Sequence, residues 1–380
     1  MQINRSMSEM KPVKGLEAAR DNGAVSRPDQ VFDRMKSTIA PDTGYTLRIS
    51  TFGCNFRCTY CSKGKKFKVA PVSRDERLDI IKACVGNGIY INRWTGGEPT
   101  ALPDFVDIVS EAQEAGVRTQ MLSTNGSLLA GIDEDLRKAG IVRVNISLDT
   151  LDRDKFAKIT GRDMLPKVLQ AIERSVGIFE LTKINCVLQK SNLDEMPQMI
   201  DFLSRFRGAP KPIVLRYIEL VKGGFLGDTD FVEAEHCTHK ELTDSLKRKY
   251  GVVEPVKVEG DNPMCYYLRI PEKGVTIGLV PNFSTNYSCG GVNCRKLRLN
   301  PTGVLSNCSI YQHFSHDLRG TTFEQKMAVV KHLVEEKMAR TEVDFAQLKH
   351  YQTDYQFWRF GAPSSQVDFD DKGPERKDGT

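Results

Sequence analysis

Three cysteines lie close together in the sequence Gly53-Cys54-Asn55-Phe56-Arg57-Cys58-Thr59-Tyr60-Cys61, with the spacing C-x3-C-x2-C. Three thiolates on one loop can ligate three irons of a cubane cluster, because iron–sulfur clusters are held by cysteine sulfur. The fourth iron then has no protein ligand, and a substrate or cofactor can bind there. A zinc site or three unrelated buried cysteines are the alternatives. A structural zinc site normally has four ligands, and no fourth cysteine or histidine stands near this loop. The spacing therefore predicts an iron–sulfur site with an open iron.

A second motif, Thr95-Gly96-Gly97-Glu98-Pro99, follows the second predicted strand. Adjacent glycines let the backbone approach a ligand closely, and a carboxylate such as that of Glu98 accepts a hydrogen bond from an ammonium group. Together with the cysteine loop and the aromatic Tyr60, this motif resembles the signature of radical S-adenosylmethionine (SAM) enzymes. The resemblance implies that the open iron chelates the amino and carboxylate groups of SAM. It also implies that an electron from the cluster cleaves SAM to a 5′-deoxyadenosyl radical.

Three further cysteines, Cys289, Cys294 and Cys308, have the spacing C-x4-C-x13-C. They are compatible with a second cubane that has one open iron, or with a zinc site that lacks a ligand. Free core cysteines are the remaining alternative. Glycines inside the set and the Asn300-Pro301-Thr302-Gly303 turn favour a loop that carries ligands.

The two cysteine sets together resemble the GTP 3′,8-cyclases of molybdenum-cofactor biosynthesis. These lyases carry a second [4Fe–4S] cluster whose open iron touches the guanine. Ordered matches to that family cover most of residues 45–310 and are very unlikely by chance. They are Leu47-Arg48-Ile49-Ser50, Arg93-Trp94-Thr95-Gly96-Gly97-Glu98-Pro99, Ser123-Thr124-Asn125-Gly126, residues 144–152, Ile159-Thr160-Gly161-Arg162, Lys183-Ile184-Asn185, residues 215–219 and residues 296–299.

The resemblance also assigns residues to two binding sites. The SAM site would be formed by Tyr60, Gly96, Gly97, Glu98, Ser147 and Val221. The nucleotide site would be lined by Arg48, Arg93, Thr124, Lys183, Lys296 and Arg298. Arg216 could serve either the SAM carboxylate or a phosphate. Burying the roughly four negative charges of a nucleoside triphosphate is costly unless cations pair with them, and five of the nucleotide-site residues are cationic.

Some features depart from the cyclase pattern and keep other functions open. The second set has four residues between its first two cysteines where the cyclases have two. Arg295-Lys296-Leu297-Arg298 stands in place of Asn-Arg-Leu-Arg, and lysine cannot replace arginine in bidentate recognition. The chain has a long N-terminal extension and does not end in Gly-Gly. The alternative enzyme modifies a natural product or peptide and uses the second cluster as an electron relay or substrate anchor. The alternative class is a non-enzymatic iron–sulfur or zinc scaffold.

Other cysteines, histidines and lysines are assigned simpler roles. Cys84, Cys186 and Cys265 lie in apolar contexts and are predicted to fill the core. His236-Cys237-Thr238-His239 resembles a metal site in its spacing, but the start of a surface helix is the favoured interpretation. The lysine-rich residues 63–68 could dock an acidic reductant such as flavodoxin or ferredoxin.

Composition limits the class of protein. The chain has 380 residues, 40% hydrophobic and 27% charged, which excludes a disordered, collagen-like or coiled-coil protein. No apolar run approaches the roughly 18 residues of a membrane span, and residues 1–27 lack the apolar stretch of a signal peptide. The net charge of +5 is too small to indicate a nucleic-acid or membrane partner. Clustered cysteines in a reducing compartment usually bind metal, so a cytoplasmic protein with a small-molecule substrate is expected.

The elements that must position these residues alternate between β-rich and amphipathic helical patterns. Strands are predicted at residues 45–51, 89–94, 117–123, 142–148, 182–188 and 213–218, and helices at 74–85, 103–115, 133–138, 165–179 and 193–206. This alternation predicts a parallel α/β sheet with right-handed crossovers, either an open layer or a curved barrel. In both, ligands bind at the carboxyl ends of the strands.

The pattern changes after residue 222. A helix at residues 239–250, strands at 266–270 and 275–279 and a helix at 322–338 predict a smaller α+β module. With the resemblance, the expected fold is a partial (β/α)6 TIM-like barrel followed by a cluster-binding module. The expected divisions are an N-terminal extension (1–44), the radical SAM core (45–221), the second-cluster module (222–345) and a tail (346–380).

Overall fold

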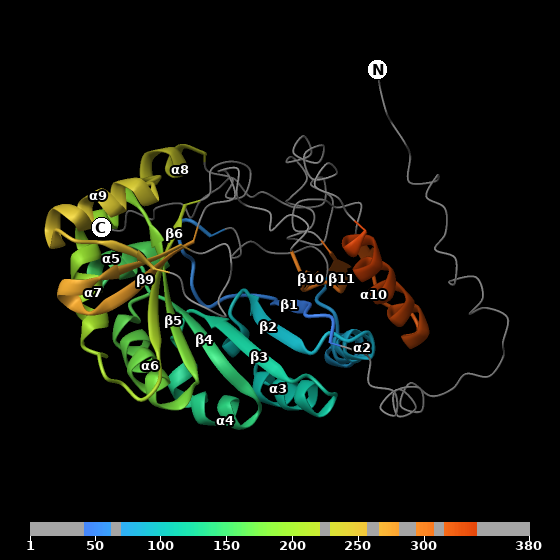
Figure 1. The fold of residues 1–380 in the computed structure, drawn as a ribbon. Helices are drawn as coiled ribbons and strands as arrows, with labels where there is room; N and C mark the ends of the chain where they lie inside the picture. Colours follow the sequence, from blue (N-terminus) through green and yellow to red (C-terminus); the bar gives the residue numbers. More distant parts are fainter. Residues whose placement is uncertain are drawn as a thin grey trace, which may run out of the picture.

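The computed structural model describes residues 42–61, 70–220, 229–256, 266–280, 294–307 and 315–339 (Figure 1). Six strands follow one another in sequence order across the sheet, and each pairs in parallel with the next. They are β1 (Thr46–Thr51), β2 (Ile91–Gly96), β3 (Thr119–Thr124), β4 (Ile141–Ser147), β5 (Leu181–Leu188) and β6 (Ile213–Glu219). Figure 1 shows the sheet curving, with helices along its outer side, so the predicted partial barrel is confirmed.

Six α-helices lie between these strands in the described part of the chain. They are α2 (Arg74–Gly86), α3 (Phe105–Glu114), α4 (Asp133–Lys138), α5 (Arg153–Thr160), α6 (Leu165–Ile178) and α7 (Met196–Ser204). Helices α2 and α5 begin at side-chain caps. Ser73 and Glu76 form a capping box before α2. The predicted helix over 193–206 is instead a 3₁₀ turn (Lys190–Glu195) followed by α7. Pro197 favours the first turn of a helix because it lacks an N–H, so the α-helix begins beside it.

Later segments extend both edges of the same sheet. At one edge, β10 (Lys296–Leu299) pairs in parallel with β1 and is followed by antiparallel β11 (Val304–Ser306) and β12 (Ser315–Asp317). At the other edge, β9 (Val275–Val280) pairs in parallel with β6 and is followed by antiparallel β8 (Tyr266–Ile270) and β7 (Glu254–Val256). The C-terminal strands therefore share the sheet of the barrel. The domain boundary at residue 221 stays a prediction.

Three more helices belong to this later part of the chain: α8 (Thr229–Glu235), α9 (His239–Tyr250) and α10 (Phe323–Met338). Helix α10 packs against α2 (Figure 1), where Asn87 Nδ2 donates to Met327 O at 3.2 Å. Among the described residues, no helix combines the length and the apolar character needed to cross a membrane.

The core lies between the sheet and the surrounding helices. On β1, Leu47 and Ile49 are fully buried in a hydrophobic cluster that includes Ile80 and Ile81 of α2. Since side chains alternate along a strand, the residue between them, Arg48, points to the opposite, interior face. The concave face therefore carries the charged residues, and the apolar core supports it from behind.

Candidate active site

The first cysteine loop leaves the carboxyl end of β1 and is held against the glycine motif after β2. Gly97 N donates to Thr51 O at 3.1 Å, and Glu98 N donates to Gly53 O at 2.7 Å. A Cβ placed on Gly97 would lie only 1.4 Å from Gly53 O. The sequence predicted glycines that let the backbone approach a ligand. The structure shows that Gly97 lets two loops approach each other.

The end of helix α5 holds the other side of the cysteine loop. Arg57 N donates to Thr160 O at 2.8 Å, and Thr59 N donates to Ile159 O at 2.9 Å. Arg162 Nε donates to Asn55 O at 3.2 Å. Helix α5 was not predicted, although the segment Ile159-Thr160-Gly161-Arg162 was singled out by its resemblance. Its backbone carbonyls and one guanidinium fix the loop that carries the cysteines.

Glu98 is almost completely buried (1% exposed), and protein donors already bind its carboxylate. Its Oε1 accepts from Thr100 N at 3.1 Å and from the hydroxyls of Thr100 and Thr124, both at 2.6 Å. Its Oε2 accepts from Asn125 N at 2.6 Å. Thr124, predicted to contact substrate, is thus engaged with Glu98. An ammonium group would have to bind at Oε2, which has more acceptor capacity left.

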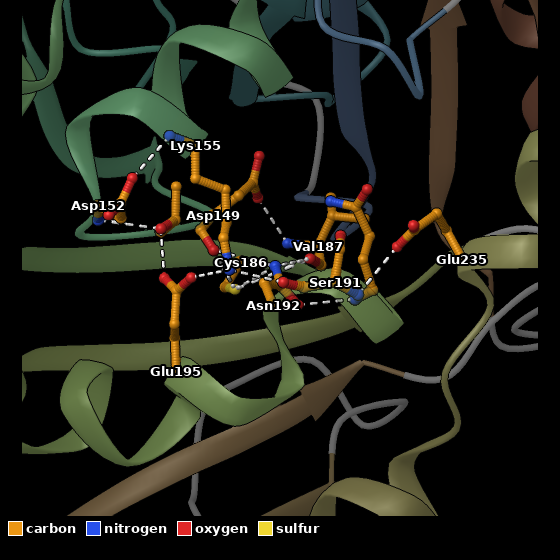
Figure 2. Close-up of polar contacts among 11 residues, drawn as sticks. Asp149, Asp152, Lys155, Cys186, Val187, Ser191, Asn192, Glu195 and Glu235 are labelled. Atoms are coloured by element: carbon orange, nitrogen blue, oxygen red, sulfur yellow. Dashed lines mark hydrogen bonds and ion pairs between the residues drawn. The ribbon is translucent and has the colours of Figure 1, made fainter.

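Tyr60, between two cysteines of the loop, is anchored by a carboxylate that the sequence did not single out. The Tyr60 hydroxyl donates to Asp149 Oδ2 at 2.6 Å, and Val187 N donates to Asp149 Oδ1 at 2.7 Å. Asn192 Nδ2 donates to the Asp149 carbonyl at 3.0 Å (Figure 2). Burial raises the pKa of Asp149 to about 6. The signal that could have found Asp149 was its place in the matched segment 144–152.

The thiols of the loop are partly buried, and this affects their protonation. Burial raises the pKa of Cys54 and Cys58, and the Asp149 carboxylate adds to the effect on Cys58. Cys54 Sγ accepts from Phe56 N at 3.4 Å and from Asn125 Nδ2 at 3.9 Å. Metal ligation must therefore displace protons from these thiols.

A cubane cluster fits this donor set. Within the described part of the chain, no three cysteine, histidine or carboxylate side chains are arranged to hold one metal ion. A cubane takes one thiolate on each of three irons, so its ligands need not converge on a single point. Cys54, Cys58 and Cys61 provide three half-buried thiols on one clamped loop.

A row of cations crosses the interior face below the loop. Arg48 on β1 is in register with Arg93 on β2 and with Arg298 on β10, and residues in register on neighbouring strands share a face. Lys296 is in register with Thr46. The pKa of Lys296 falls to about 8 because it is buried and because Arg298, Arg93 and Arg48 lie close enough to repel its charge. The structure thus brings together four predicted nucleotide-binding side chains.

Arg216 lies on β6, in a row of polar side chains that crosses β5 and β4. Its Nε and Nη2 donate to Asn185 Oδ1 at 3.0 and 2.7 Å, and Nη2 also donates to Asn145 Oδ1 at 3.2 Å. Lys183 is in register with Asn145 and is 6% exposed. Asn185 is in register with both Arg216 and Ser147, so these two predicted binding residues stand at one level of the sheet.

Comparison with known proteins agrees with this geometry. The family model of the "Radical SAM superfamily" matches residues 49–203. The chain is 33% identical over 297 residues to a GTP 3′,8-cyclase of Marinobacter nauticus, covering 76% of this chain and 84% of that protein. It is also 33% identical over 275 residues to the GTP 3′,8-cyclase of Campylobacter fetus, covering 70% and 80%. The chain belongs to the GTP 3′,8-cyclase family of radical SAM enzymes.

Solved structures of lower sequence identity share the fold of this family member. SuiB of Streptococcus suis, bound to S-adenosylmethionine, matches with a TM-score of 0.55 and 15% identity, over 85% of this chain and 76% of that chain. As a member of this family, the chain is an enzyme. Radical SAM enzymes share a [4Fe–4S] cluster and SAM as cofactors. The predicted enzyme class is confirmed.

Of the second cysteine set, only Cys294 lies among the described residues of this radical SAM enzyme; Cys289 and Cys308 lie outside them. Cys294 stands two residues before Lys296, at the amino end of β10. The role of Cys294 as a cluster ligand stays a prediction. Strand β10 lies between β11 and β1 and runs parallel to β1, so Cys294 lies at the end of the barrel opposite the first cysteine loop.

Lys337 of α10 donates to Cys294 Sγ at 3.3 Å and was missed by the sequence analysis. Burial alone would raise the pKa of Cys294, but the ammonium groups of Lys337 and Lys296 lower it below its ordinary value. The first loop, where the pKa of two thiols is raised, shows the opposite behaviour. The available signal was the helical spacing that places residue 337 on the buried side of α10 with Val330 and Val334.

The structure also tests the predictions for the core cysteines and for the helix that starts near residue 239. Cys84 and Cys186 are fully buried in the core, as predicted. Helix α9 begins at His239 with Thr238 as its N-cap, which confirms the helix start. Three predictions concern residues outside the described part of the chain: Val221, Cys265 and residues 63–68.

Proposed function

We propose that the enzyme carries two [4Fe–4S] clusters, abstracts a hydrogen atom from GTP and closes a carbon–carbon bond between the ribose and the guanine. The observation that carries this proposal is the register of Arg298, Arg48 and Arg93 on three adjacent strands. Such a concentration of positive charge on the interior face fits a ligand with several negative charges. Relatives at 33% identity are named GTP 3′,8-cyclase, which supports GTP as that ligand.

The first cluster would be held by Cys54, Cys58 and Cys61, and it would supply the electron that cleaves bound SAM to a 5′-deoxyadenosyl radical. The protein's own residues fix the loop around it. Gly97 provides the close approach of the second loop, and Tyr60 ties the loop to the buried Asp149. Two asparagine side chains orient the Arg216 guanidinium toward a SAM carboxylate or a phosphate.

The proposed substrate site extends from this loop along the cation row. Arg48, Arg93 and Arg298 would pair with the triphosphate, and positioning it would bring the ribose to the radical. One ribose hydrogen would move to the 5′-deoxyadenosyl group, and the ribose carbon would then bond to the base. One electron from a reductant such as flavodoxin or ferredoxin and one proton from solvent would complete the reaction. The product is therefore an isomer of GTP.

The second cluster would be ligated by Cys289, Cys294 and Cys308 and would orient the base. Its support in the described residues is the position of Cys294 beside Lys296, which belongs to the cation set. The lowered pKa of Cys294 is consistent with a sulfur that serves as a ligand, because thiolates ligate metals.

The proposal is tested by reconstituting the protein anaerobically with iron and sulfide and adding SAM and reductant. 5′-Deoxyadenosine is then measured with GTP, ATP or no nucleotide. We expect formation that depends on GTP, with a product of the same mass as GTP. Arg93→Ala should reduce this activity strongly, whereas the matched control Arg118→Ala, an exposed arginine stacked on Tyr90, should not.

Two results would contradict the proposal. SAM cleavage that no nucleotide stimulates would contradict the substrate and favour a natural-product or peptide-modifying enzyme. Iron binding without any SAM cleavage would contradict the radical chemistry itself.

A further inference from the structure

Lys337 lies in the last turn of helix α10 and is 4% exposed. Its ammonium group donates to Cys294 Sγ at 3.3 Å, to Lys296 O at 2.8 Å and to Asn307 O. Cys294 and Lys296 mark the start of β10, whereas Asn307 follows β11. A single buried side chain therefore ties helix α10 to both ends of the β10–β11 hairpin.

The hairpin is fixed to the helix from the other direction as well. Asn307 Nδ2 donates to Leu333 O and to Glu336 Oε2, both at 3.0 Å. These bonds hold the backbone carbonyl of Asn307 in place to accept from Lys337. The contact between the lysine and the cysteine sulfur thus belongs to a defined polar network in the interior.

Several positive charges surround this half-buried sulfur. Besides Lys337, the cationic groups of Lys296 and Arg298 act on Cys294. A nearby negative group stabilises buried positive charges of this kind. A thiolate ligand of a metal cluster is such a group, whereas a neutral packing cysteine is not.

Helix α10 contains a second buried lysine that contacts no cysteine among the described residues. Lys326 is 3% exposed, and its Nζ donates to Thr321 O at 2.6 Å. It shares with Lys337 the helix, the burial and a backbone carbonyl partner. It lacks the sulfur contact, which makes it a matched control.

We propose that Lys337 is a positioning residue of the second iron–sulfur site, where it holds the Cys294 sulfur and raises the reduction potential of the bound cluster. The inference rests on the second cluster of the proposed function. Cluster potentials depend on nearby charge and on hydrogen bonds to the sulfurs, and a donating ammonium group favours the reduced, more negative cluster. Groups that hold a metal ligand from behind typically change metal affinity about 10- to 100-fold when they are removed.

The test uses the full-length chain in which Cys54, Cys58 and Cys61 are all replaced by Ala, so that only the second site can bind a cluster. This parent protein is reconstituted anaerobically. Iron and sulfide per chain, the rate of cluster loss to a chelator and the reduction potential followed by electron paramagnetic resonance are measured. The variants Lys337→Met, Lys337→Gln, Lys337→Arg and Lys326→Met are compared in the same background.

We expect Lys337→Met to lose its cluster about 10-fold faster than the parent and to show a lower potential in the cluster that remains. Lys337→Gln, which keeps a donor without the charge, should also have a lowered potential. Lys337→Arg should keep most of the potential, and Lys326→Met should match the parent. Circular dichroism identifies a variant that fails to fold, and if Lys337→Met fails, the Gln variant decides the comparison.

The possible results separate the two proposals. A parent that binds no cluster would overturn the second cluster and this inference with it. A parent that binds a cluster, with Lys337→Met unchanged in stability and potential, would overturn the inference alone. Equal losses in Lys337→Met and Lys326→Met would also overturn it, because they would indicate a general effect on helix packing.

Discussion

Replacement of Gly97 by Ala tests whether the contact between the two loops builds the first cluster site. The φ angle of Gly97 is not in the left-handed region, so its backbone tolerates alanine. The added Cβ would nevertheless lie 1.4 Å from Gly53 O and 2.3 Å from Gly53 C. Both are backbone atoms and cannot rotate away. The loops must therefore separate by about 1.6 Å to bring the shorter contact to 3.0 Å.

This separation has a cost that can be estimated from the structure. The bond from Glu98 N to Gly53 O is 2.7 Å long and that from Gly97 N to Thr51 O is 3.1 Å, and neither survives such a shift. Two hydrogen bonds at about 1 kcal/mol each and overpacking of about 1–3 kcal/mol amount to about 3–5 kcal/mol. Since the strain is local, we expect the cysteine loop to open before the barrel unfolds.

The assay is anaerobic reconstitution followed by analysis of iron and sulfide and by measurement of 5′-deoxyadenosine. Gly131→Ala is the matched control, because a Cβ at Gly131 meets nothing within 4 Å and its φ is also not left-handed. Gly97→Ala should lose most of the first cluster and of SAM cleavage, while Gly131→Ala keeps both. If Gly97→Ala retained cluster content and SAM cleavage equal to the control, the loop contact would not build the site.

Three further predictions concern the loop anchors and the cation row. Folding raises the pKa of Asp149 from 3.8 to about 6, so the folded protein is destabilised when this carboxyl loses its proton. As the pH rises from about 4 to above 6, the unfolding free energy of the cluster-free wild type should therefore fall by up to about 3 kcal/mol relative to that of Asp149→Asn. Urea titrations at several pH values measure this difference, and a difference that does not change with pH would refute the prediction. Arg162→Ala should lower the cluster content several-fold, because the Arg162 guanidinium binds the Asn55 carbonyl of the cysteine loop. The control Arg153→Ala removes only an exposed ion pair and should keep the cluster. Equal iron content in the two variants would refute this prediction. Arg298→Ala should weaken GTP binding about 10- to 100-fold in calorimetry, the effect of losing a charged hydrogen bond, and an unchanged affinity would place the triphosphate elsewhere.

The local features of the barrel could be predicted from the sequence because they depend on neighbouring residues. Helices at 133–138 and 239–250 were predicted with the bounds that the structure shows. The six parallel strands followed from the alternation of β-rich and amphipathic segments. The cysteine loop was correctly expected after β1, because the motif directly follows the β-rich residues 45–51 in the sequence.

The long-range features could not be predicted in this way. Strand β10 pairs with β1 across about 250 residues of sequence, and no local pattern of residues 296–299 identifies that partner. The contact of Gly97 with Gly53 is another case, because nothing in the sequence indicates that two glycines in different loops lie against each other. Helix periodicity could have placed Lys337 on a buried side, but only the folded hairpin shows that a cysteine sulfur lies opposite.

The pairing of β10 with β1 also explains how two cysteine sites could act on one substrate. The first loop follows the carboxyl end of β1, whereas Cys294 precedes the amino end of β10, and the two strands run in parallel. Arg48 and Arg298 stand between these ends. A strand of the length of β1 spans about 17 Å at roughly 3.3 Å per residue, which is comparable with an extended nucleoside triphosphate. Cys294 and the first cysteine loop therefore lie at opposite ends of one cation-lined face, an arrangement that a separate C-terminal module would not guarantee.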